Sequence, residues 1–187
     1  MPIYTRKGDK GTTSTFRNPQ TRISKASAIF EAIGNIDELN SFLGIVIAQT
    51  ENSLLKDKLT EVQNNLLKIG SQLAGSKVRI SKNQIIKMEK DIDKMTSTMP
   101  VLRNFVFPLG TRDSVNLQFA RALSRRAERG VVALNTNQKK GEEIVHSNVL
   151  KYLNRLSDYL FTLARKANFD MGIKDKIWKT SKITKKS

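Results

Sequence analysis

Three features of the sequence predict an all-α fold, a five-helix up-and-down bundle. Five stretches repeat apolar residues every three or four positions, which is the spacing of an amphipathic helix. The segments between these stretches are short and carry the glycine, proline and asparagine residues that mark turns. No two stretches show the alternation of apolar and polar residues expected of paired strands. The 187 residues are enough for one domain with a substantial core.

The first helix is predicted from Lys25 to about Gln49. Gly34 and Gly44 lie inside it, where each costs roughly 1 kcal/mol relative to alanine, so we expect close packing or a ligand to compensate. The segment GNIDELNSFLG places Asp37 on a face of small polar residues, which suits an arginine from another helix or subunit. The predicted apolar stripe consists of Ile29, Ile33, Ile36, Leu43 and Ile47.

The second and third helices are predicted from their end signals and show no residues suited to chemistry. Asn52 or Ser53 caps the second helix, and Gly75 ends it. The third helix is shorter and begins at Ser81, which has the spacing of a capping box to Gln84. Steps of four and three residues, as in a bundle seam, separate the apolar residues of the second helix: Leu55, Leu59, Val62, Leu66, Ile69 and Leu73.

The fourth helix, predicted from about Asp113 to Leu134, carries the strongest functional signal. Residues 117–129 read LQFARALSRRAER and place several guanidinium groups on one face, whose rigid fork of donors suits phosphate or carboxylate. The simpler alternative is a solvated basic face. The members of the stripe are Arg121, Arg125 and Glu128, with Arg129 beside them. The opposite stripe, predicted to enter the core, consists of Phe119, Leu123, Ala127 and Leu134.

The fifth helix is predicted from about Glu142 to Asn168, after a polar turn over residues 135–141. Asn154 and Asp158 lie together on its outer side at positions i and i+4. The predicted core stripe of this helix consists of Leu150, Leu153, Leu156, Leu160 and Leu163.

Two predicted loops carry candidate binding residues. Residues 4–16, YTRKGDKGTTSTF, combine glycines that permit turns with a run of hydroxyls, a composition suited to cradling phosphate. The pattern is not GxxxxGK[ST], and a flexible polar leader is an equal alternative. Residues 99–110, MPVLRNFVFPLG, place Phe105 in a loop, where it covers the core or contacts a flat cofactor.

Composition narrows the classes of function. The chain has no cysteine and only one histidine, His146, which argues against thiolate and histidine metal sites and against serine–histidine hydrolases. The formal net charge of +16 suggests an anionic partner. Residues 173–187 hold six lysines and one aspartate, and we expect a disordered basic tail there. Neither a signal peptide nor a membrane span is evident, so we expect a cytoplasmic protein.

Four stretches together resemble the PduO-type corrinoid (cob(I)alamin) adenosyltransferases. They are YTRKGDKGTTSTF, GNIDELNSFLG, LQFARALSRRAERGVVAL and YLNRLSDYLFTLAR, in the same order as in that family. The resemblance implies a ferritin-like five-helix bundle in a homotrimer, with a domain over residues 1–172 and an ATP-binding loop over residues 1–24. It also implies transfer of the 5′-deoxyadenosyl group of ATP to the cobalt of cob(I)alamin, giving adenosylcobalamin and triphosphate.

The resemblance assigns site residues position by position. Asp37 and Arg121 match an intersubunit salt bridge on the corrinoid side and, with Arg125 and Glu128, are expected to be catalytic. Phe105 matches the phenylalanine on the lower cobalt face, and Asp158 matches a supporting aspartate. The expected ATP-binding residues are Thr5, Arg6, Lys7, Gly8, Thr13, Ser14, Lys25, Arg125, Arg126, Glu128, Arg129 and Asn154. Mg²⁺ is expected to arrive with ATP, with Glu128 as a candidate ligand.

One position departs from the family pattern Phe-x-x-Pro-Gly-Gly. Leu109 stands where the first glycine is usual, and leucine adopts a positive φ less readily than glycine. We therefore expect the turn that carries Phe105 to differ.

Two other classes of function remain open. A basic helical module could bind nucleic acid through Arg121, Arg125, Arg126, Arg129 and the lysine tail, although few aromatics are available for stacking. A trimeric carrier could instead bind ATP and corrinoid and deliver the product with little turnover. If the chain is an adenosyltransferase, as the resemblance implies, its expected partners are a corrinoid reductase and an adenosylcobalamin-dependent enzyme.

Overall fold

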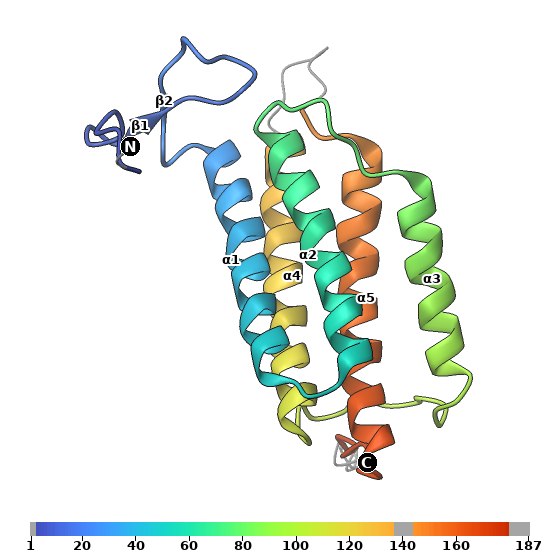
Figure 1. Ribbon diagram of the computed structural model, residues 1–187. Helices are drawn as coiled ribbons and strands as arrows, with labels where there is room; N and C mark the ends of the chain where they lie inside the picture. The colour runs from blue at the N-terminus through green and yellow to red at the C-terminus, as the bar shows by residue number, and fades with distance from the viewer. Residues whose placement is uncertain (1–2, 137–143, 180–187) are drawn as a thin grey trace, which may run out of the picture.

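The computed structural model describes residues 3–136 and 144–179. Its five helices lie side by side, and each runs opposite to the one before it, so the up-and-down bundle is confirmed (Figure 1). α4 packs against α5 and α1, α2 packs against α1, and α3 packs against α5. The helices are α1 (Ala28–Gln49), α2 (Ser53–Leu73), α3 (Lys82–Thr96), α4 (Arg112–Thr136) and α5 (Ser147–Asp170).

The predicted caps of the middle helices are confirmed. Asn52 accepts a hydrogen bond from the N–H of Leu55 at 3.0 Å, and the side chain of Gln84 accepts one from the N–H of Ser81 at 2.7 Å. Gly75 follows α2 with a φ of 105°, a left-handed conformation that ends the helix. No helix within the described residues is both long and apolar enough to cross a lipid bilayer.

The first and last helices begin later than predicted. α1 starts at Ala28 because the N–H of Lys25 donates to the Gly11 carbonyl at 2.9 Å, which ties Lys25 to the preceding loop. α5 starts at Ser147, since His146 caps it and residues 144–146 are not helical. The predicted turn over residues 135–141 is wrong for its first two residues, which belong to α4, and its remainder lies outside the described residues.

A short strand pair corrects the expectation that no strands pair. β1 (Thr12–Thr13) and β2 (Ile23–Ser24) are antiparallel, with Thr12 opposite Ser24. Two-residue strands are too short to show an alternating pattern in the sequence. This hairpin closes the N-terminal loop, which projects from the bundle beside the start of α1 (Figure 1).

The core stripes are largely as predicted, with one clear error. Phe119, expected in the core, is 55% exposed on the surface of α4, and its ring meets that of Phe42 edge to face at 4.9 Å. Leu117 and Ala120 fill the core at this level instead. The predicted stripes of α1 and α5 also included residues that are only partly buried, namely Ile29, Ile33, Ile47 and Leu150.

The expected tail is ordered over its first half. Ile177 forms an antiparallel bridge with Val106, the N–H of Phe107 donates to the Lys176 carbonyl at 2.9 Å, and the N–H of Trp178 donates to the Phe105 carbonyl at 2.8 Å. The expectation of disorder from residue 173 is therefore wrong for residues 173–179. Residues 180–187 lie outside the described part of the chain.

Candidate functional site

A cleft of about 700 Å³ lies at the end of the bundle where α5 ends, between α4, α5, the loop before α4 and the C-terminal segment. Aromatic side chains line part of the cleft, and guanidinium groups from α4 and from the loop before it line another part. A single carboxylate, that of Asp158, also lines the cleft. The aromatic residues are Phe105, Phe161 and Trp178, and the cationic residues are Arg103, Arg121 and Arg125.

The arginine wall lacks a counter-ion. Arg121 donates from Nε to Oε1 of Gln118 at 2.9 Å, and neither Arg121 nor Arg125 forms an ion pair with an acid among the described residues. Burial, and after it the charge of Arg125, lower the pKa of Arg121. Two guanidinium groups that repel one another in a partly dry cleft favour the binding of an anion.

Asp158 does not neutralise these arginines. Its Oδ2 accepts from Arg155 at 2.8 Å, and Arg155 also contacts Glu89 of α3 at 3.1 Å. Through Arg155, Asp158 in the cleft is linked to α3.

The predicted site residues in the next turns of α4 point to different neighbours. Oε1 of Glu128 accepts from Nδ2 of Asn154 at 3.0 Å, which joins α4 to α5. Arg126 points the other way and pairs with Glu38 of α1. Arg129 is exposed. Glu128 and Asn154 therefore form one unit, whereas Arg126 belongs to a different face from Arg125.

The N-terminal loop forms a second cationic region. The Lys25 ammonium lies over Gly8, where an added Cβ would be 3.0 Å from Nζ. Arg22, which the sequence analysis overlooked, contacts the carbonyls of Lys7 and Thr12 and donates to the Thr12 hydroxyl at 3.3 Å. Arg22 is a basic residue of an irregular loop, and no pattern in the sequence singles it out.

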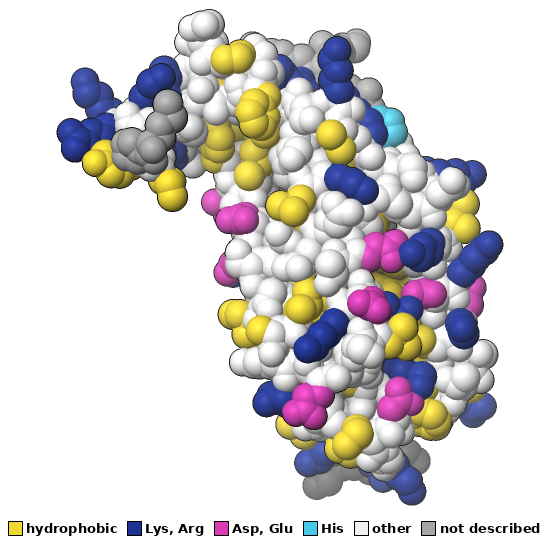
Figure 2. Space-filling view, viewed as in Figure 1, with side chains coloured by type: hydrophobic (Ala, Val, Ile, Leu, Met, Phe, Trp, Pro, Cys, Tyr) yellow, Lys and Arg dark blue, Asp and Glu magenta, His cyan; other side chains and the backbone are white. Residues whose placement is uncertain are grey.

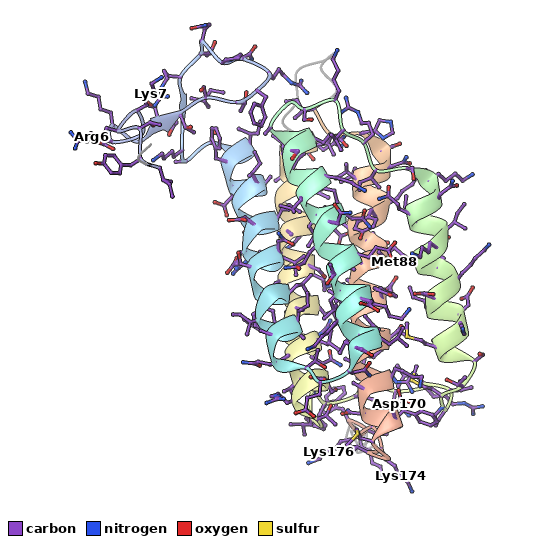
Figure 3. All side chains as sticks on the ribbon, in the orientation of Figure 1. Arg6, Lys7, Met88, Asp170, Lys174 and Lys176 are labelled. Atoms are coloured by element: carbon purple, nitrogen blue, oxygen red, sulfur yellow. The ribbon has the colours of Figure 1, made fainter. Side chains whose placement is uncertain are left out.

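The other residues of this loop that were predicted to bind ATP differ in their exposure. Thr5, Arg6 and Lys7 are exposed, and Thr13 and Ser14 are half-buried. Figure 3 shows Arg6 and Lys7 projecting from the loop, away from the helices.

One chain does not bring the two cationic regions together. None of the N-terminal loop residues lines the cleft that contains Arg125. Asp37 lines a separate cleft of about 340 Å³ between α1 and α2, so it does not meet Arg121 within the chain.

The turn after Phe105 is built differently from the expectation. Gly110, not Leu109, has a positive φ, of 128°, and a Cβ at Gly110 would lie 2.0 Å from Oδ1 of Asn168. Asn168 donates to the Leu109 carbonyl at 2.8 Å and accepts from the N–H of Thr111 at 2.9 Å. Gly110 alone carries the positive φ of this turn, and Leu109 does not need one. The sequence gives no signal for the part played by Asn168.

Comparison with known sequences identifies relatives. The sequence profile of the cobalamin adenosyltransferase family matches residues 3–167. Corrinoid adenosyltransferase MMAB of Homo sapiens is 41% identical over 188 residues, covering 94% of this chain and 72% of that protein. A corrinoid adenosyltransferase of Bacillus subtilis is 39% identical over 191 residues, covering 98% of this chain and 95% of that protein.

Solved structures share the fold. A Phe-to-Ala variant of a PduO-type ATP:corrinoid adenosyltransferase from Lactobacillus reuteri, complexed with cobalamin and ATP, superposes with a TM-score of 0.88 and 30% identity. That match covers 96% of this chain and 100% of the other. An Arg-to-Lys variant complexed with ATP gives a TM-score of 0.82 and 32% identity, covering 95% and 100%.

Proposed function

The chain belongs to the cobalamin adenosyltransferase family, and from this premise we propose that it transfers the 5′-deoxyadenosyl group of ATP to the cobalt of a reduced corrinoid. ATP and cob(I)alamin are its substrates, and adenosylcobalamin and triphosphate are its products. The cleft carries the proposal, because arginines that pair with no acid of the described residues line it together with aromatic rings. A polyanion and a flat macrocycle that must react with each other need these two surfaces side by side.

The reaction needs no nucleophilic side chain, because the corrinoid substrate supplies the cobalt. Cobalt provides the electron pair of the new Co–C5′ bond, while the C5′–O bond breaks and its electron pair leaves with triphosphate. The protein has to hold C5′ in line with the metal and stabilise the charge on the leaving group.

We assign these tasks to named groups. Arg125, Arg129 and Lys25 stabilise the triphosphate, and Glu128 with Asn154 holds the nucleoside end. Arg126 takes part only if it leaves its pair with Glu38. The loop residues assigned to the phosphates are Thr5, Arg6, Lys7, Gly8, Thr13 and Ser14.

Phe105 is assigned to the lower face of the corrin ring. The residue is 79% exposed and lines the cleft, so its ring is free to pack on a flat ligand. An aromatic ring in that position excludes water and the lower axial base, which makes cob(II)alamin easier to reduce. Asp158, held by Arg155, supports the same wall.

We further propose that the working form is a homotrimer with ATP between protomers. Where α1 and α4 meet, Phe119 is 55% exposed beside Phe42, and such an apolar surface is typical of a subunit interface. A neighbouring copy would bring its N-terminal loop to Arg125. It would also let Asp37 of one copy pair with Arg121 of another.

Mg²⁺ would arrive with ATP. Asn154 occupies one carboxylate oxygen of Glu128 and leaves the other for a cation or its water. Magnesium in nucleotide sites is typically held by phosphates, water and one or two carboxylates. Among the described residues no group of three or more histidine, cysteine, aspartate or glutamate side chains could hold a metal. The donor set therefore fits an ion bound mainly by the nucleotide.

The decisive experiment is a spectroscopic titration of cob(II)alamin with ATP and a reductant, run beside a native mass measurement. The proposal expects the adenosylcobalamin spectrum over many turnovers and a mass of three chains. Retention of product after one turnover would indicate the carrier. No corrinoid change together with salt-sensitive DNA binding would indicate the nucleic-acid module.

The reaction also defines its partners. A corrinoid reductase supplies the reduced substrate, and an adenosylcobalamin-dependent enzyme uses the product. Cytoplasmic location stays a prediction from the sequence.

A further inference from the structure

Arg165 joins three segments that come from different parts of the sequence. It is near the end of α5, and its side chain is only 8% exposed. Nε of Arg165 contacts Oδ2 of Asp175 at 2.8 Å, and the same guanidinium donates to the Pro100 carbonyl at 2.9 Å. A buried guanidinium with these two fixed acceptors holds both segments to α5.

Both partners of Arg165 are in segments that shape the cleft. Pro100 begins the loop that carries Phe105, and Asp175 is in the C-terminal segment, residues 173–178. Figure 3 places Lys174 and Lys176 of this segment at the end of the bundle where α5 ends. Beyond Asp175, backbone hydrogen bonds pair the segment with the Phe105 loop.

The pairing brings Trp178 onto the aromatic wall. Its ring lies 6.3 Å from that of Phe105, at an interplanar angle of 67°, and both rings line the cleft. The segment itself buries little apolar surface, since Ile173 is 42% exposed, Ile177 37% and Trp178 47%. A segment with so little burial depends on its few polar contacts to stay closed.

We propose that Arg165 and Asp175 are positioning residues, whose ion pair holds residues 173–178 as a clasp against the Phe105 loop. Through this clasp the pair fixes the aromatic wall that receives the corrinoid. The identity of that ligand rests on the proposed function, but the clasp does not. A role in holding the bundle together is disfavoured, because neither acceptor of Arg165 belongs to another helix.

The chain offers a direct probe of the clasp, because Trp178 is its only tryptophan. The test compares Asp175→Ala with Asp170→Asn in the full-length protein without ligands. Asp170 is a matched control, since it pairs with Lys166 on the exposed end of α5. In Asp175→Ala we expect Trp178 anisotropy to fall and acrylamide quenching to rise about twofold, as local opening frees the ring. Helical circular dichroism should stay unchanged. Wild-type quenching in Asp175→Ala, or an equal rise in Asp170→Asn, would overturn the clasp.

A second measurement links the clasp to the corrinoid. Removing one partner of a buried ion pair is costly, so we expect Asp175→Ala to raise the half-saturating corrinoid concentration about tenfold. The half-saturating ATP concentration should not change. Arg165→Ala should raise this concentration at least as much, because it also removes the hydrogen bond to the Pro100 carbonyl, and the double variant should be no worse than Arg165→Ala alone.

The outcomes separate the two proposals. A loosened tryptophan in a protein whose wild type never adenosylates corrinoid would refute the proposed function and leave the clasp standing. An active enzyme whose corrinoid dependence is the same in Asp175→Ala and wild type would refute the positioning role. The positioning role would also be refuted if Asp175→Ala changed turnover but left the half-saturating concentrations of both ATP and corrinoid unchanged.

Discussion

The two ends of the bundle differ in their chemistry. Residues 4–25, beside the start of α1, present hydroxyls, glycine N–H groups and cations, and Figure 2 shows basic side chains gathered there. The opposite end, formed by residues 99–110 and 173–178, presents aromatic rings. One end suits a polyphosphate, and the other suits a flat, largely apolar macrocycle. A reaction between two such unlike substrates explains why a single bundle carries both surfaces.

The two ends also differ in how they are held. At the polar end Thr15 is buried, and the N–H of Arg17 donates to the Ala74 carbonyl at 3.3 Å. At the aromatic end, the side chains of Asn168 and Arg165 each bond two groups of the adjacent segments. The aromatic wall is therefore braced by side chains of α5, whereas a backbone hydrogen bond attaches the N-terminal loop to the end of α2. We expect the N-terminal loop to adapt more to its ligand.

The largest effect is expected between the ends, at Arg125. Arg125→Ala removes a donor that we assign to the leaving triphosphate, and it should lower turnover by about 10²- to 10³-fold without unfolding the bundle. Steady-state kinetics and thermal unfolding measure both quantities. Arg126→Ala is the comparison, because Arg126 already pairs with Glu38 and should matter less. Wild-type turnover in Arg125→Ala would remove it from the site.

The aromatic end can be tested through the oxidation state of the substrate. Phe105→Ala should slow adenosylation about 10²-fold when cob(II)alamin must be reduced, because water and base regain the lower cobalt face. With chemically reduced cob(I)alamin the loss should be much smaller. Rates measured in parallel with the two substrates decide the matter, and equal losses would contradict the role given to Phe105.

The polar end can be tested where the N-terminal loop contacts the end of α2. Gly75 has a φ of 105°, and a Cβ there would lie 2.5 Å from the backbone nitrogen of Arg17. Gly75→Ala should therefore displace the N-terminal loop and raise the half-saturating ATP concentration about tenfold, with the strain costing about 1–3 kcal/mol of stability. Gly70→Ala is the control, since its Cβ would meet only Ile36, at 3.9 Å. An unchanged ATP dependence in Gly75→Ala would show that the attachment does not shape the loop.

The smallest effect on activity is expected at α3, outside both ends. Burial would raise the pKa of Asp91, but its hydrogen bonds and the charge of Lys58 together lower that pKa below 3.8. A lowered pKa in the folded state stabilises the protein above pH 3.8, and this contribution is lost as pH falls through the folded value. Asp91→Asn should cost about 1 kcal/mol near neutral pH and less in acid, with turnover unchanged. Denaturation across pH, with the exposed Asp93→Asn as control, measures this. A cost that persists below the folded pKa would exclude the ion pair.

Local patterns predicted the helices and the arginine stripe. The caps at Asn52 and Ser81 and the stripe around Arg125 depend on residues a few positions apart, so the sequence contains the whole signal. The resemblance supplied Phe105 and Lys25. The boundaries failed where a distant contact competes with the local pattern, as at Lys25, whose N–H is bound to Gly11.

The sequence by itself determined a five-helix bundle with an arginine stripe, because helical periodicity and capping are properties of neighbouring residues. Only the tertiary structure decided that Phe119 is on the surface, that Gly110 makes the turn against Asn168, and that Asp175 folds back onto Arg165. Each of these depends on atoms brought together from elements far apart in the chain. Lysine-rich composition predicted disorder for residues 173–179, but one buried guanidinium and a few backbone hydrogen bonds outweigh that tendency.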